Sequence, residues 1–123
     1  MFESGAILIY LAEKTGKFLP ANTLKARGEL LSWLLFVASG VGPFSGQSVH
    51  FRQYAPKGND YAVNRYMYEA QRHYGILDAR LGKQRYMAGD SYGIVDMAVP
   101  MTYYDWASLP NDYTKWMNWE KDR

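Results

Sequence analysis

The feature that most constrains the fold is a regular apolar stripe between residues 60 and 81. Its members are Val63, Met67, Ala70, Tyr74, Leu77 and Leu81. They are spaced 4, 3, 4, 3 and 4 residues apart, which places them on one side of an α-helix. Asp60 precedes the stripe and is of a residue type that favours helix N-caps. The spacing therefore predicts one long helix over 60–81 whose apolar side packs against a partner.

Two further helices are predicted before this one. The first covers residues 4–14, with Ser4 as its N-cap and Gly16 placed to end it. The second covers residues 24–39, with Asn22 or Thr23 as its cap. Its helically spaced apolar residues predict one broad buried face. They are Leu30, Leu31, Leu34, Leu35 and Ala38.

Glycine and proline mark the remaining boundaries. Gly40, Gly42 and Pro43 are expected to bend or break the second helix, and residues 44–54 are then either extended or helical. Residues 94–108 are predicted to form a helix kinked at Pro100, and a last helix is predicted to start near Tyr113. No segment alternates polar and apolar residues as a sheet requires. The fold class predicted is all-α, a helical bundle.

Composition excludes several classes of function. The chain has 123 residues, 48% of them hydrophobic and 21% charged, which suits one folded helical core. It has no cysteine, so no disulfide or thiolate chemistry resides in it. A net charge of +2 does not indicate nucleic acid or an anionic membrane as partner. The apolar run over residues 6–12 is too short to span a membrane and lacks the basic flank of a signal peptide, so we expect a cytoplasmic protein.

The first recognisable motif is the run from Glu3 to Pro20, ESGAILIYLAEKTGKFLP. It resembles the last helix and linker of the N-terminal domain of glutathione transferases. The resemblance implies that Glu3 and Ser4 hold the γ-glutamyl end of glutathione. A helix N-terminus attracts a carboxylate, the Ser4 hydroxyl adds a donor, and Glu3 suits an ammonium group. The structural alternative is that Ser4 only caps its helix and Glu3 is a favourable charge in the first turn.

A second motif, YMAGDSYGIVDMA over residues 86–98, resembles the loop and core-helix start of the same family. There a capping box joins the cap residue to an aspartate three residues later. Gly93 occupies the cap position in this chain, and Asp96 is the aspartate. We expect these two residues to have a structural role. The two motifs together imply the helical bundle of the glutathione transferase C-terminal domain.

The middle of the chain narrows the resemblance to nu-class bacterial transferases and their fungal relatives. The segments that carry it, in order, are GPFSGQSVHF, YAP, YAVNRY and EAQRHYGILDARL. The resemblance implies glutathione as co-substrate and either conjugation or glutathione-dependent disulfide reduction as the ancestral activity. By the same analogy Gln47, His50, Phe51 and Arg52 are candidates to line the substrate cleft. Arg52 suits a carboxylate, whereas a histidine beside an aromatic residue is more often packed than functional.

Neither a metal site nor a nucleic-acid surface is expected. His50 and His73 are the only histidines and have no clustered carboxylates near them in sequence. Arg65 and Arg72 are interleaved with tyrosines, but Glu69 lies four residues after the first and three before the second. This spacing, with Arg80 continuing the series, is typical of a salt-bridged solvent face.

The domain assignment follows from the resemblance. Residues 1–20 correspond to the remnant last helix and linker of a thioredoxin-like domain, and residues 21–123 to the helical domain. The family's thiol-activating residue has no counterpart here, so we expect this truncated chain, a fragment or a natural short protein, to be inactive in isolation. The alternative is a non-catalytic helical module for protein–protein interaction. Because Ile7, Leu8, Ile9 and Leu11 need a cover, we also expect a homo-oligomer or a missing N-terminal domain.

Overall fold

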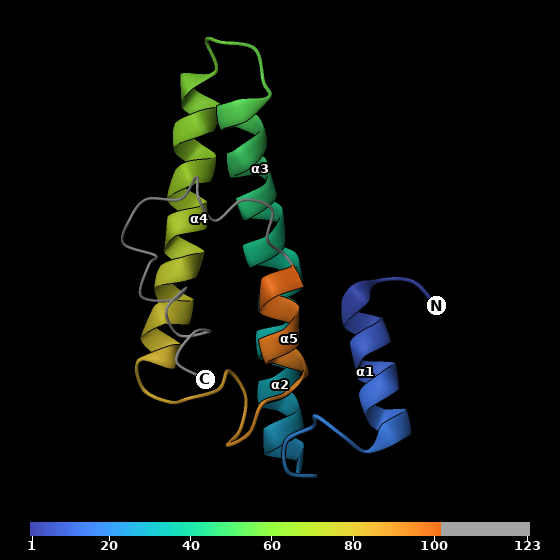
Figure 1. Ribbon diagram of the computed structural model, residues 1–123. Coiled ribbons are helices and arrows are strands. Elements are labelled where there is room, and N and C mark those ends of the chain that lie inside the picture. Colours follow the sequence, from blue (N-terminus) through green and yellow to red (C-terminus); the bar gives the residue numbers. More distant parts are fainter. Residues whose placement is uncertain (102–123) are drawn as a thin grey trace.

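The computed structural model describes residues 1–101, and all regular structure within that range is helical. The elements are α1 (Ser4–Thr15), α2 (Leu24–Phe36), a π-helical turn η1 (Val37–Val41), α3 (Gly42–Gln53), α4 (Asp60–Leu81) and α5 (Ile94–Met101). Figure 1 shows α2 and α3 following one another as a nearly continuous rod. Helix α4 lies alongside this rod, and α5 packs against α2 and η1. Helix α1 lies on the far side of α5 from α4. The all-α prediction is confirmed, and the long helix has the predicted bounds.

Local chemistry accounts for some of the helix ends. Thr23 caps α2, since its Oγ1 accepts a hydrogen bond of 3.1 Å from the Ala26 N–H. Gly16 ends α1 in the left-handed conformation with φ of 66°. The predicted caps Ser4 and Asp60 are wrong. Each is the first residue inside its helix, and the cap positions belong to Glu3 and Asn59, whose side chains make no capping hydrogen bond.

The predicted break after α2 takes a different form. The chain stays helical through η1, where the Gly42 N–H donates to the Val37 carbonyl five residues earlier. Pro43 falls in the first turn of α3, directly after η1, and has no N–H to donate to the helical turn before it. Residues 44–53 are therefore helical, and the extended alternative is wrong. The α-helical part of the second segment ends at Phe36 instead of residue 39.

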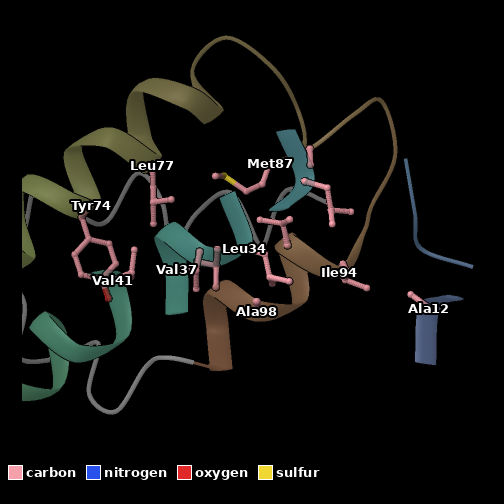
Figure 2. Packing of buried hydrophobic residues seen from close by; sticks show 13 residues of the cluster. Ala12, Leu34, Val37, Val41, Tyr74, Leu77, Met87, Ile94 and Ala98 are labelled. Carbon is pink, nitrogen blue, oxygen red and sulfur yellow. The ribbon is translucent and has the colours of Figure 1, made fainter. Parts of the chain in front are cut away.

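One apolar core joins α2, η1, α4 and α5. Leu77 and Met87 are among its largest fully buried side chains, and Figure 2 shows Leu34, Val37 and Ala98 gathered beside them. From the predicted stripe of α4, Ala70, Tyr74 and Leu77 are buried. Burial of each large apolar side chain contributes roughly 1.5–3 kcal/mol. In α2 the predicted face is narrower than expected, because Leu35 is 63% exposed and Ala38 is also exposed.

Helix α1 packs on α5 through only part of its surface. Ala12 is buried, and Leu8 and Ile9 pack against the core. Ile7 and Leu11 remain 38% and 48% exposed. The predicted kink after Pro100, residues 102–108 of the predicted fourth helix and the last helix from Tyr113 lie outside the described residues. Within residues 1–101, no helix is both long enough and apolar enough to cross a membrane.

Candidate functional site

The start of α1 presents an exposed acidic residue and a free helix end. Glu3 has φ of 68° and ψ of 117°, a conformation that non-glycine residues rarely adopt. Its carbonyl accepts the Ile7 N–H at 3.0 Å, which is the first backbone bond of the helix. The amides of residues 4–6 precede that bond and point out of the helix end, next to the exposed Ser4 side chain. This arrangement suits an anionic group such as a carboxylate.

Helix α3 brings three of its four candidate residues to one side. Gln47 and His50 are exposed and lie one helical turn apart. The ring of His50 meets that of Phe51 edge-on at 5.2 Å. Phe51 in turn stacks on Tyr66 of α4, with ring centroids 5.2 Å apart and planes 11° apart. The result is a polar edge backed by two aromatic rings.

Arg52 does not join this group. Its position follows Ser45 and Ser48 at helical spacing, so it extends the face of α3 that holds these two buried serines. Its Nε donates to the Ser48 carbonyl at 3.2 Å. The four candidates lie close together in the sequence but are divided between two sides of one helix.

The two candidate groups are held by different elements. Glu3 and Ser4 begin α1, which packs on α5, whereas Gln47, His50 and Phe51 belong to α3, which packs on α4 (Figure 1). A cavity of about 500 Å³ lies elsewhere, between the linker after α1 and the loop before α5. Pro20, Lys25, Glu29 and Asp90 are among its lining residues. None of the sequence-predicted site residues lines it.

The buried carboxylate of Asp96 accepts hydrogen bonds from two backbone amides. Its Oδ2 accepts the Gly93 N–H and its Oδ1 accepts the Met87 N–H, both at 2.9 Å, and the residue is 1% exposed. The glycine at position 93 has a local cause. A Cβ there would lie 3.1 Å from the Phe18 carbonyl oxygen, which also accepts the Ile94 N–H at 3.2 Å. A serine or threonine, the residues usual at a cap, would therefore be a tight fit against the linker at this position.

The carboxylate between the two arginines of α4 is less exposed than the sequence indicated. Glu69 is 7% exposed and pairs with both Arg65 and Arg72, the latter at 3.0 Å. The hydrogen bond from Arg65, then that from Arg72, lowers the pKa of the Glu69 carboxyl below its ordinary value. The predicted ion pairs form, but Glu69 is buried beneath the arginines and not on a solvated face.

Arg80 is turned away from these two arginines. It pairs with Glu29 of α2, donates to the Met87 carbonyl at 3.1 and 3.2 Å, and covers the Trp33 ring at 5.2 Å. Sequence spacing along α4 alone did not reveal this role. In the part of the chain that the structure describes, no three potential metal ligands gather in one place.

Three features match one class of protein. They are the all-helical core, the linker that packs closely against Gly93, and the helix with Glu3 and Ser4 at its start. The chain belongs to the glutathione transferase family, and its all-helical structure fits the C-terminal helical domain of that family. It is 47% identical over 98 residues to the disulfide-bond oxidoreductase YfcG of Escherichia coli. This match covers 80% of the chain and 45% of YfcG, so the chain spans less than half of this curated relative.

Solved structures agree with the sequence match. The glutathione transferase YghU from Streptococcus pneumoniae, solved with glutathione, superposes with a TM-score of 0.82 at 36% identity, over 98% of this chain and 49% of that one. A Pseudomonas putida glutathione transferase, solved with glutathione disulfide, gives 0.78 at 34% identity, over 100% and 52% of the two chains. No family model matches the chain. The neighbours thus show glutathione as the ligand of this family.

Proposed function

We propose that the chain provides the helical half of a glutathione-dependent transferase of nu-class type. Its ancestral activity is glutathione conjugation or glutathione-dependent disulfide reduction. The observation that carries this proposal is the 47% identity to a disulfide-bond oxidoreductase across 80% of the chain. The solved relatives with bound glutathione or glutathione disulfide support the same substrate class. The site of action proposed is the cytoplasm.

Residues 1–20 are the last helix and linker of a thioredoxin-like domain in this proposal, and residues 21–123 form the helical domain. The division is supported by the packing of α1, which reaches the core through Leu8, Ile9 and Ala12 and leaves its other side uncovered. Glu3 and Ser4 then receive the γ-glutamyl end of glutathione. The free amides of α1 supply the positive end for its carboxylate, and Glu3 supplies the negative charge for its ammonium group.

The second substrate is proposed to lie against α3. Gln47 and His50 offer exposed hydrogen-bonding groups, and Phe51 offers an apolar edge held in place by its stack on Tyr66. Arg52 is less suited to this role, because it lies on the face of Ser45 and Ser48. This group orients a substrate, and the proposal assigns it no part in ionising the thiol.

A polypeptide of these 123 residues alone is proposed not to activate glutathione. A thiol with a pKa near 8.5 needs a placed donor or cation to form its thiolate at neutral pH. The groups assigned here to glutathione contact its carboxylate and ammonium end and lie away from its sulfur. Full activity therefore requires the thioredoxin-like half.

The alternative function is a non-catalytic helical module for protein–protein interaction. It is favoured by one observation, the uncovered apolar side of α1, which exposes Ile7 and Leu11 and is followed by the exposed Phe18 of the linker. A second copy of the chain is the proposed occupant of that side. Under this reading the chain assembles without turning over glutathione.

Isothermal titration of the purified chain with reduced and with oxidised glutathione tests the leading proposal. Saturable binding is expected, and Ser4→Ala is expected to weaken it at least 10-fold. Ser91→Ala, an exposed serine in the loop before α5, serves as the matched control and leaves binding unchanged. No heat with either ligand up to millimolar concentration contradicts a surviving glutathione site and favours the interaction module.

A further inference from the structure

A buried histidine occupies the inside of the junction between α2 and α3. His73 of α4 is 4% exposed. Its ring packs at 5.1 Å on Phe36, the last residue of α2, and at 5.0 Å on Phe44 in the first turn of α3. The imidazole therefore contacts the helical rod on both sides of the π-helical turn η1.

Both ring nitrogens of His73 have partners on α4. Nδ1 lies 2.7 Å from the Glu69 carbonyl oxygen, which only accepts, so Nδ1 carries the proton. Nε2 lies 3.4 Å from Nη2 of Arg72, which only donates, so Nε2 is the acceptor. The charged groups near the ring are Glu69 and Arg72 of α4, with Arg65 bound to Glu69. From α2, η1 and α3 the groups against it are Phe36, Gly40 and Phe44, none of which is charged.

The edge of the same ring fills the space beside Gly40, the fourth residue of η1. A Cβ on Gly40 would lie 2.4 Å from His73 Nε2 and 2.6 Å from Cδ2. Since no side-chain atom approaches that closely, position 40 has no room for a side chain while the imidazole of His73 lies in this place. The ring is in turn held by its two hydrogen bonds and cannot move aside cheaply.

The turn that rests on this ring sets which side of α3 faces α4. A π-helical turn holds one more residue than an α-helical turn, so every later side chain is rotated by about 100°. In the observed register the small residues Ser45 and Ser48 face α4, and Ser45 Oγ donates to the Tyr74 hydroxyl at 3.1 Å. Without the extra residue, positions 44 and 47 would take their places.

We infer that His73 is a positioning residue that holds η1 in its π-helical form and thereby keeps Gln47 and His50 exposed on α3, beside the stack of Phe51 on Tyr66. The inference deepens the proposed function, since it rests on that function for the role of these three residues. The register itself is independent of any ligand. Neither Gly40 nor His73 touches the substrate in this account.

Single cysteines report the register directly, because the chain has none of its own. Gln47→Cys places a thiol at an exposed position, and Ser48→Cys places one at a position that is 0% exposed. With Ellman's reagent the first is expected to react at least 10-fold faster than the second. The circular dichroism and the urea midpoint of each variant establish that it is folded.

When each cysteine is combined with His73→Leu, we expect the faster reaction of position 47 over position 48 to be lost or reversed, because leucine fills the space but makes neither hydrogen bond. Gly40→Ala is expected to do the same by clashing with the ring. His73→Gln retains a donor and an acceptor and is expected to restore the fast reaction at position 47. If the leucine variant does not fold, His73→Met carries the same expectation.

A folded His73→Leu or His73→Met variant in which position 47 still reacts at least 10-fold faster than position 48 overturns the inference. His73 would then be an ordinary packing residue. The matched control is Gln71→Ala, an exposed change two residues away on α4 that leaves the order intact. Because no glutathione is used, failure of the proposed function, seen as absence of binding by titration, is distinct from failure of this inference.

Discussion

Individual buried polar groups hold neighbouring segments of this domain in place, and Asp96 is the clearest case. One carboxylate closes the start of α5 through Gly93 and holds the preceding loop through Met87. Asp96→Ala leaves two backbone amides without their charged acceptor and is expected to lower the free energy of unfolding by about 3 kcal/mol or more. Urea unfolding measures the effect. Asp90→Ala, an exposed aspartate in the same loop, is the control, and an equal loss for both would contradict this assignment.

The hydroxyl of Ser48 is an opposite case. It is fully buried and makes no hydrogen bond within the described part of the chain. A buried donor without a partner costs about 1–3 kcal/mol, so Ser48→Ala is expected to raise the free energy of unfolding or leave it unchanged. Ser45→Ala, which removes a bond to Tyr74, is expected to lower it by about 1 kcal/mol. The urea midpoint should therefore fall for Ser45→Ala and should not fall for Ser48→Ala, and a clear loss for Ser48→Ala would show a partner for its hydroxyl.

Glu69 makes the free energy of unfolding of this domain depend on pH in the acidic range. Because its pKa is lowered by Arg65 and Arg72 in the folded chain, the unfolded chain binds more protons as the pH falls. The stability from this carboxylate is therefore complete well above its ordinary pKa of 4.5 and is lost as the pH drops below that value. Urea midpoints measured from pH 7 to pH 3 should fall less steeply in Glu69→Gln. Glu13→Gln, which alters an exposed pair with Arg27, should keep the wild-type slope.

At the scale of elements, Arg80 joins three segments that the chain brings together from far apart. It connects α4 to Glu29 and Trp33 of α2 and to the loop at Met87. Arg80→Met keeps the apolar stem but loses the ion pair and the bonds to the carbonyl, so we expect a loss of about 2–3 kcal/mol in the free energy of unfolding. Urea unfolding tests this, with Lys83→Met at an exposed nearby position as control. A loss below about 0.5 kcal/mol would show that the contacts of Arg80 are surface contacts only.

Helix existence and the long helix over 60–81 were predictable because they depend on spacing within one segment. The caps at Ser4 and Asp60 were not, since the cap is decided by the backbone angles of the residue before the first turn. The π-helical turn was also hidden. Gly40, Gly42 and Pro43 indicated a break in the helix, and the ring that packs beside Gly40 belongs to His73, 33 positions later.

The candidate site shows the same division between local and distant information. Helical spacing alone places Gln47 and His50 on one side and separates Arg52 from them. The stack of Phe51 on Tyr66 and the close approach of Phe18 to Gly93 depend on contacts between segments, which no single-segment pattern contains. Sequence resemblance supplied the ligand class, and the structure supplied the grouping of side chains.

For the molecule as a whole, the two sides of α1 differ in whether other residues of the chain cover them. One side packs against the core through Leu8, Ile9 and Ala12, while Ile7 and Leu11 on the other side remain exposed to solvent. An apolar side of this kind is stabilised when another surface removes it from water. The proposed homo-oligomer provides that surface without any further domain.

The purified chain is accordingly expected to self-associate, with an average mass by light scattering that rises with concentration above that of one chain. A double change, Ile7→Lys with Leu11→Lys, places two charges on the open side of α1 and is expected to shift the species to the single-chain mass at the same concentration. Leu24→Lys alters a leucine that is 92% exposed at the start of α2 and does not belong to α1, and it should leave the association intact. A single-chain mass for the unaltered protein at all concentrations would exclude the second copy as occupant, and the open side of α1 would then belong to a thioredoxin-like partner domain.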